Sequence, residues 1–308
     1  LWVEVNPLPF INILMRSMMN KKYSEKAFQV LTYSTSLFTI IALLAIIYSL
    51  FKEGLPLFNK VPIFDFLFGC NWYPTNVEPE FGAWTLIVGS LSVTIGALLI
   101  GIPLGLGSAI FISEVAGNCL KEIVKPIIEL LAGIPSVVYG LFGMSFLAPQ
   151  IRNWLNLDTG LNIFSASVIL GIMIVPIVAS MSEDALSSVP KSLREAALAL
   201  GSTKMECIFL VIIPAAKRGI LGSIMLGVGR AIGETMVVLM VAGGSAQIPQ
   251  GVFSSVRPLT STIAAEMGET VIGSLHYQSL YALAILLFLI TFFSNLITEF
   301  FILKRERK

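Results

Sequence analysis

Apolar residues along this chain gather in long uninterrupted runs, and shorter polar stretches rich in charge separate them. A helix rises about 1.5 Å per residue, so roughly 20 apolar residues cross the ~30 Å hydrocarbon core of a membrane. Runs of this kind predict six membrane-spanning helices, at residues 28–51, 81–113, 127–149, 165–182, 219–242 and 279–302. The runs lack the apolar–polar alternation of barrel strands, so we predict an all-α polytopic membrane protein.

The composition favours the same class. Hydrophobic residues make up 56% of the 308 and charged residues only 13%, whereas soluble domains carry about 25% charged residues. A core cannot absorb this excess of apolar surface, which therefore needs lipid. The formal net charge of +1 creates no field that would attract nucleic acid, so no nucleic-acid partner is expected.

The distribution of Lys and Arg predicts the orientation. An even number of spans puts both termini on one side, and most of the 20 Lys and Arg residues fall on that side, which the positive-inside rule assigns to the cytoplasm. They are Arg16, Lys21, Lys22, Lys26, Lys121, Lys125, Lys191, Arg194, Lys204, Lys217, Arg218, Lys304, Arg305, Arg307 and Lys308. The chain then divides into a cytoplasmic N-terminal segment (1–27), a transmembrane domain (28–302, core about 84–302) and a basic tail (303–308).

Cysteine and histidine usage argues against metal and redox chemistry. The three cysteines form no CxxC pair and His276 is the single histidine, so the ligand cluster of a zinc site is missing. The predicted topology puts Cys70 outside and the other two cysteines, Cys119 and Cys207, inside. No disulfide is expected between the two sides.

The longest predicted cytoplasmic loop, residues 183–218, carries a short helical pattern. Ser192 and Glu195 have the spacing of a capping box, which predicts a helix start, and Gly201 suits its exit. Apolar residues at i, i+3, i+4 and i+7 form one stripe: Leu193, Ala196, Ala197 and Leu200. Periodicity leaves two interpretations open. The helix packs on its own membrane bundle, or it inserts into the groove of a partner.

Two charges interrupt the fifth predicted span. Arg230 and Glu234 are spaced i, i+4 and share one face of a continuous helix, where charges at membrane depth are expected to face a pore or a partner. They form either a self-neutralised structural pair or a gate that contacts an oxyanion, because Arg suits bidentate phosphate binding. The residues alone leave both open. GxxxG spacings, for which helix packing is the expected role, occur at Gly101–Gly105 and Gly229–Gly233.

The loop pattern also resembles a known motif. Glu195-Ala196-Ala197, then Gly201, then Pro214 is similar to the EAA loop of ABC-importer permeases, with valine and isoleucine where that family usually has isoleucine and leucine before the proline. In that family the loop docks into a cleft of the ATP-hydrolysing subunit. The resemblance implies an ATPase-coupling loop formed by Glu195, Ala196, Ala197, Leu200, Gly201 and Pro214. The sequence has no GxxxxGK[ST] loop, so ATP is expected on a partner chain and this chain is not expected to be an enzyme.

Three further stretches, around residues 128–140, 229–236 and 259–269, resemble the permeases of bacterial phosphate-specific ABC systems, and the likeness runs from about residue 84 to the C-terminus. It implies a substrate pathway formed by Arg230, Glu234, Thr235, Ser136, Tyr139 and Glu129. For the first stretch a kink is the structural alternative, because Pro135 removes a helical hydrogen bond and Ser136 can satisfy the freed carbonyl. The last stretch, followed by His276, is more similar to the C-type subunit than to the A-type.

This resemblance implies the type I ABC importer permease fold with six transmembrane helices in the bacterial inner membrane. It implies phosphate import by alternating access and no cofactor on this chain. The implied partners are an ABC ATPase dimer, a second related permease that completes a heterodimer, and a periplasmic or lipid-anchored phosphate-binding protein.

Three alternatives remain from the residues. One arginine does not distinguish tetrahedral anions, so a permease for sulfate, molybdate or phosphonate is the first. A standalone secondary carrier predicts inverted repeats, and no clear repeat is present. A membrane-embedded hydrolase is disfavoured by the lone histidine and the absence of a metal-ligand cluster.

Overall fold

The computed structural model describes residues 8–303, without the side chains of residues 8–24, 27, 118 and 298–303. Most of the predicted N-terminal segment's basic side chains and the basic tail lie outside the described residues. The chain divides into two units, Leu1–Lys52 and Glu53–Lys308. Helix α1 (Leu8–Gly54) makes up the described part of the first unit, and its apolar portion and the following turn form one candidate span, Phe28–Asn59.

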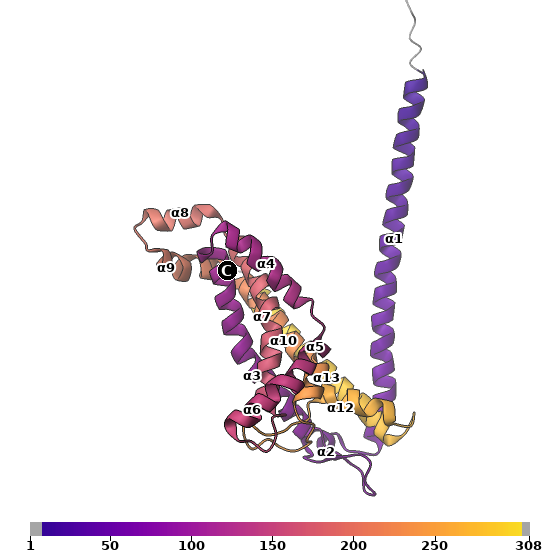
Figure 1. Cartoon of the computed structure of the whole chain (residues 1–308). Coiled ribbons are helices and arrows are strands. Elements are labelled where there is room, and N and C mark those ends of the chain that lie inside the picture. Colours follow the sequence, from indigo (N-terminus) through magenta and orange to yellow (C-terminus); the bar gives the residue numbers. More distant parts are fainter. Residues whose placement is uncertain (1–7, 304–308) are drawn as a thin grey trace, which may run out of the picture. The chain divides into compact units, whose positions relative to one another are not determined.

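The second unit is a helical bundle with one small hairpin (Figure 1). Its elements are η1 (Leu55–Asn59), α2 (Ile63–Phe68), β1 (Trp72–Tyr73), β2 (Glu80–Phe81), α3 (Trp84–Ile110), η2 (Phe111–Val115), α4 (Asn118–Ala132), α5 (Ser136–Phe142), η3 (Gly143–Leu147), α6 (Ala148–Leu155), α7 (Ile163–Ser187), α8 (Lys191–Ala199), α9 (Lys204–Glu206), η4 (Cys207–Ile212), α10 (Ile213–Gly233), α11 (Met236–Val241), α12 (Leu259–Glu266), η5 (Met267–Glu269) and α13 (Leu275–Leu303). The segments η2, η3 and η4 are π-helical.

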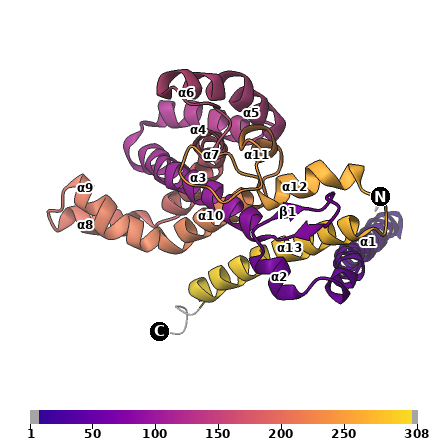
Figure 2. The same ribbon diagram turned by 90° about the horizontal axis from the view of Figure 1, so that it is seen from below.

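Helices α3, α7 and α10 pack together as the centre of the unit, with α8 and α9 at one end and α2 and α6 at the other (Figures 1 and 2). Glycines bring α3 and α7 close. A Cβ at Gly101 would lie 2.9 Å from the Gly171 carbonyl oxygen, and one at Gly105 would lie 2.8 Å from Val178. The predicted packing role of Gly101 and Gly105 is therefore confirmed, since only glycine permits this approach.

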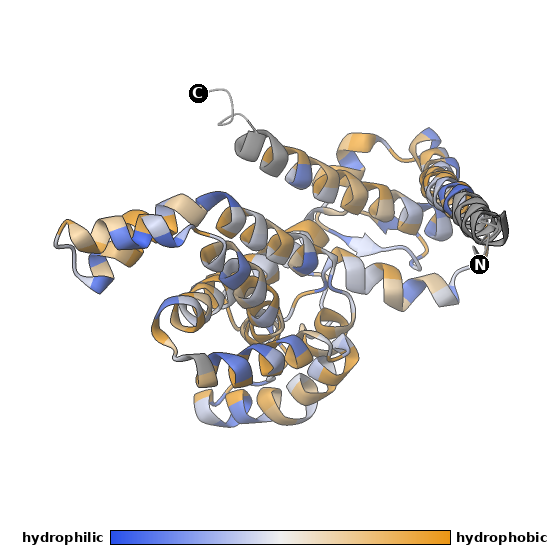
Figure 3. Ribbon diagram, turned by 90° about the horizontal axis from the view of Figure 1, so that it is seen from above, coloured by the Kyte–Doolittle hydropathy of each residue, from blue (hydrophilic) through white to orange (hydrophobic). Residues whose placement is uncertain are grey.

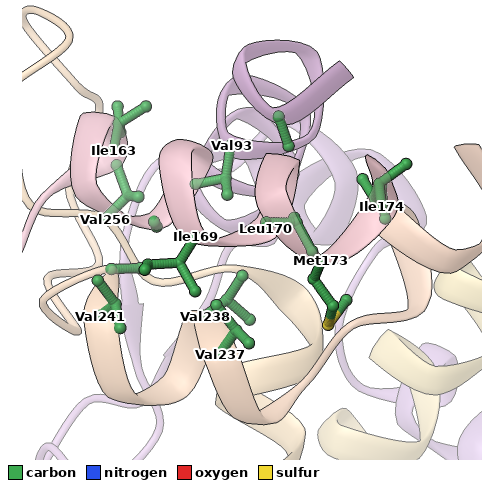
Figure 4. Close-up of a cluster of buried hydrophobic side chains, with 14 of the residues drawn as sticks. Val93, Ile163, Ile169, Leu170, Met173, Ile174, Val237, Val238, Val241 and Val256 are labelled. Atoms are coloured by element: carbon green, nitrogen blue, oxygen red, sulfur yellow. The ribbon is translucent and has the colours of Figure 1, made fainter. Parts of the chain in front are cut away.

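The buried core lies where these helices meet α11 (Figure 4). Val93 of α3, Leu170 of α7 and Val237 of α11 are almost completely buried in one cluster. Many large apolar side chains on the long helices are exposed, and hydrophobic residues, coloured orange in Figure 3, are frequent along their ribbons. A soluble protein would not expose so much apolar surface, so these faces are suited to lipid.

The spans largely match the prediction. Five segments of the described chain are long and apolar enough to cross a membrane, and the pair Cys119–Ala132 and Ser136–Leu155 makes a sixth if it is one broken span. The two halves of this pair are bent by 88°, so the predicted third span is wrong as a single straight helix. Proline disfavours helical geometry in the residue before it, so α4 ends ahead of Pro135, which is the N-cap of α5.

At the α2 end, a polar hub centred on Glu266 joins four segments. The Glu266 carboxylate accepts hydrogen bonds from Trp72 Nε1 at 3.0 Å and Arg257 Nη1 at 2.7 Å, and it lies 2.8 Å from His276 Nε2. Trp72 is 2% exposed and belongs to a second apolar cluster with Leu280. The hub therefore fastens β1, the segment before α12, the end of α12 and the start of α13 to one another.

We expect Glu266→Gln to lower the free energy of unfolding by about 1–3 kcal/mol, because it removes the charge that satisfies three part-buried donors. Thermal unfolding of the purified protein in detergent measures this as a lower Tm. The matched control is Glu269→Gln, since that side chain is exposed three residues further on, and exposed substitutions usually change stability by no more than about 0.5 kcal/mol. Equal Tm shifts in the two variants would contradict the hub.

Candidate functional site

The fifth predicted span is broken where the sequence predicted a charged pair. Helix α10 ends at Gly233, and Glu234 has an extended backbone (φ −69°, ψ 129°). Its Oε1 accepts hydrogen bonds from the backbone N–H groups of Met236 at 3.0 Å and Val237 at 3.2 Å. An anion is favoured there because the first N–H groups of a helix have no partner within the helix. Glu234 therefore caps α11.

Helix α12 also stabilises the break between α10 and α11. The Thr260 hydroxyl donates to the backbone carbonyl oxygen of Glu234 at 2.8 Å, and Thr260 is buried. The neighbouring Thr235 hydroxyl reaches the Gly233 carbonyl at 3.4 Å. Both polar groups of Glu234 are thus used locally, so the predicted arrangement of Arg230 and Glu234 on one helix face is wrong.

Arg230 stands exposed in the last turn of α10. Within the described chain it forms no ion pair. A Cβ added at Gly229 or Gly233 would meet no atom within 4 Å, so the second GxxxG pair does not pack on a helix described here. The α10 face that carries the positive charge is therefore open in this chain.

The bent α4–α5 pair contributes the second part of this region. Helix α5 packs against α11, where a Cβ at Gly140 would lie 2.7 Å from the Met240 sulfur. The Tyr139 hydroxyl donates to the Leu131 carbonyl oxygen at 3.0 Å. Tyr139 thus satisfies a carbonyl at the end of α4, the role that the sequence assigned to Ser136.

Not all predicted pathway residues come together. Arg230, Glu234 and Thr235 lie at the break, and Tyr139 lies on α5, which packs against α11. Glu129 instead lines a separate hollow of about 370 Å³ on α4 with Lys121, Glu122, Lys125 and Pro126. Among the described side chains, no three His, Cys, Asp or Glu residues gather as a metal site.

The predicted docking loop contains a helix whose start differs from the prediction. Helix α8 begins at Lys191 after Pro190 and has no side-chain cap, so the predicted Ser192–Glu195 capping box is wrong. The capping box lies instead at the start of α9, between Thr203 and Glu206. The proline already sets the backbone for helix entry, so α8 forms without a hydroxyl cap.

The predicted exit at Gly201 is confirmed. Gly201 has φ +85°, in the left-handed region that favours glycine. Its N–H donates to the Leu198 carbonyl at 3.0 Å, and the Ser202 N–H donates to the Ala197 carbonyl at 3.3 Å. These two bonds are a Schellman motif, which closes the free carbonyls at the end of a helix.

Most of the apolar stripe on α8 is uncovered. Ala197 is 8% exposed, whereas Leu193 is 44% and Leu200 is 90% exposed. Glu195 and Ala196 are exposed as well. Packing on its own bundle therefore explains only Ala197, and the other apolar side chains of the stripe form a surface, which we call the docking face (Leu193, Ala196 and Leu200), suited to a partner.

Buried ionic contacts near this helix had no signal in the sequence. At the end of α7, Glu183 is 2% exposed and pairs with Lys121 at 2.6 Å and Lys125 at 2.7 Å, which ties α4 to α7. Arg194 of α8 pairs with Glu114 of η2 at 2.9 Å. Both sets join residues more than fifty positions apart, which no local sequence pattern encodes.

Comparison with known proteins gives a consistent result. Residues 101–307 match the family described as binding-protein-dependent transport system inner membrane component. A probable ABC transporter permease protein YqgH of Bacillus subtilis is 37% identical over 95% of this chain and 96% of its own length. The phosphate transport system permease protein PstC of Haemophilus influenzae is 35% identical over 95% of this chain and 97% of its own.

Solved structures agree on the fold. A chain of the bacterial alginate ABC transporter, solved with an alginate-bound periplasmic protein, has a TM-score of 0.62 at 18% identity and covers 87% of this chain and 92% of its own. This likeness supports the type I ABC importer permease fold. The matched family model and relatives above 30% identity over nearly the whole chain show that this protein belongs to the family of binding-protein-dependent transport system inner membrane components, the permease subunits of ABC importers.

Proposed function

We propose that this chain is a permease subunit of an ABC importer of inorganic phosphate. The observation that carries the proposal is the exposed Arg230 at the helix break, a guanidinium without an ion pair in the described chain. Arg forms bidentate bonds to phosphate oxygens, and a cation at membrane depth is expected to face a pathway or a partner. The relatives named phosphate transport system permease protein PstC, with identities of 31–35%, support the same substrate.

Hydroxyl groups near this arginine complete an oxyanion site in the proposal. In the proposal, Tyr139, Thr235 and Ser136 supply O–H donors to the anion, for which Tyr139 and Thr235 exchange their bonds to the Leu131 and Gly233 carbonyls. Donors that satisfy phosphate oxygens offset the loss of hydration. Glu234 does not compete for the guanidinium, because its carboxylate caps α11. In the same proposal, Glu129, which lines the separate hollow on α4, lines the route by which phosphate passes through the protein.

The energy enters through a partner in this proposal. An ABC ATPase dimer, which carries the ATP, binds the docking face together with Glu195, Gly201 and Pro214, and its closure drives alternating access. This chain binds no cofactor itself. A second, related permease completes a heterodimer and covers the open face of α10, and an extracytoplasmic phosphate-binding protein delivers the substrate. Both termini are cytoplasmic, and the complex resides in the bacterial inner membrane.

The test is uptake by proteoliposomes that contain the complete complex and ATP. We expect radiolabelled phosphate to accumulate with the binding protein present, and unlabelled sulfate or molybdate in tenfold excess to leave uptake unchanged. Strong competition by sulfate or molybdate would indicate that the competing oxyanion, and not phosphate, is the preferred substrate. Phosphate accumulation by this chain alone, without ATPase, would indicate a secondary carrier and contradict the proposal.

A further inference from the structure

Apolar packing and one arginine attach the docking helix α8 to the membrane bundle. Ala197, its one buried residue, belongs to an apolar cluster with Cys207 and Ile208 of η4. Arg194 makes polar contacts with other segments. Its Nη2 donates to Glu114 Oε1 at 2.9 Å and to the Leu186 carbonyl at 2.8 Å, and its Nη1 donates to the Val189 carbonyl at 3.2 Å.

Glu114 is a well-held anchor for this arginine. Its side chain is 9% exposed, and the Ser113 hydroxyl donates to the same carboxylate oxygen at 2.8 Å. It lies in η2, the π-helical segment that ends the second span, Trp84–Val115. A π-helical turn is a local irregularity that often occurs at functional positions. Of the other two acceptors, Leu186 lies in the last turn of α7, the fourth span, and Val189 follows the end of that helix.

The chain leaves α8 through Gly201 and α9 to reach η4 and α10, and Ala197 packs in one apolar cluster with Cys207 and Ile208 of η4. The guanidinium of Arg194 is a planar fork with three acceptors on other segments, so it holds α8 to them in a defined geometry. A movement of α8 therefore reaches η4 through Ala197, and it reaches the second and fourth spans through Arg194.

We infer that Arg194 and Glu114 form the connection that carries movement of the docking helix into the second and fourth spans, with Arg194 as a positioning residue. This inference rests on the proposed binding of an ATPase to α8 and does not depend on phosphate as the substrate. It predicts that loss of the connection uncouples transport from ATP hydrolysis, so that ATP is hydrolysed with little phosphate uptake. The ATPase stays bound, because the docking face is unchanged.

Hydrogen exchange on the assembled complex, with and without the non-hydrolysable ATP analogue AMP-PNP, tests the connection. In the unsubstituted complex we expect the analogue to change amide exchange in α8 and in Phe111–Val115. In Arg194→Met the change in α8 should persist and the change in Phe111–Val115 should fall at least fivefold. Glu114→Gln should act in the same direction, and Arg194→Lys should retain part of the response. Lys217→Met, which removes an exposed charge of α10, is the matched control and should behave as the unsubstituted complex.

A second readout is the number of ATP molecules hydrolysed per phosphate taken up, which we expect to rise at least tenfold in Arg194→Met. An undiminished AMP-PNP response at Phe111–Val115 would overturn the inference. So would loss of the ATPase from both Arg194→Met and Arg194→Lys, because that result assigns Arg194 to folding alone. If the unsubstituted complex imports no phosphate, the substrate proposal fails, while the exchange measurement still decides this inference.

Discussion

Phosphate uptake is expected to fall roughly ten- to hundredfold when Arg230 is replaced by alanine, because a charge-assisted hydrogen bond is worth about 1.5–3 kcal/mol. Arg230 has no ion pair within the described chain, so its removal leaves no buried partner unsatisfied and the complex should still assemble. The measurement combines uptake by proteoliposomes with co-purification of the ATPase.

Two variants make this result specific. Arg230→Lys keeps the charge and loses the planar fork, so an intermediate rate is expected. Arg152→Ala removes an exposed arginine of α6 and should leave uptake unchanged. Normal uptake in Arg230→Ala would remove Arg230 from the pathway. Loss of expression in that variant but not in Arg152→Ala would instead make the arginine a structural residue.

The second large effect is expected at the docking face. Leu200 is 90% exposed, so Leu200→Asp should not disturb folding of this chain. Burial of a leucine contributes about 1.5–3 kcal/mol, so the variant should bind the ATPase roughly ten- to hundredfold more weakly, and the buried aspartate would weaken it further. The change is measured by co-purification: the tagged permease is held in detergent, the ATPase concentration is varied, and the bound ATPase is quantified.

Val77→Asp is the matched control, because Val77 is a fully exposed apolar residue in the hairpin at the opposite end of the unit. It should leave ATPase binding unchanged, and Leu200→Met should restore most of it. ATPase binding at the original level in Leu200→Asp would show that the partner approaches another surface.

The length and position of the apolar runs predicted most of the fold. Lipid-crossing helices are recognised by length and composition, and four of the six predicted spans correspond to single described segments, while the third is bent and the fifth is broken after Gly233. The helix of the docking loop, its exit at Gly201 and the close packing at Gly101 and Gly105 were also predicted, because each depends on local geometry that a glycine or a short motif encodes.

The failures have a common physical origin. An i, i+4 spacing predicts neighbours only while the helix continues, and at Glu234 a free carboxylate competes for the N–H groups of the next helix. The capping box forms at Thr203 and not at Ser192, because Pro190 already starts α8 one residue before Ser192, whereas no proline precedes α9. Contacts such as those of Glu183 and Arg194 join distant positions, and no local pattern encodes them.

The capping role of Glu234 has an electrical consequence. Because that carboxylate bonds to the N–H groups of α11 and forms no ion pair with Arg230, the break offers a transported ion a guanidinium that no carboxylate in the described chain pairs with. A monovalent phosphate and the guanidinium of Arg230 together carry no net charge. Moving the free monovalent anion inward against an inside-negative potential costs about 2.3 kcal/mol per 100 mV. The divalent ion would keep one uncompensated charge, so membrane voltage should slow its entry more than that of the monovalent ion.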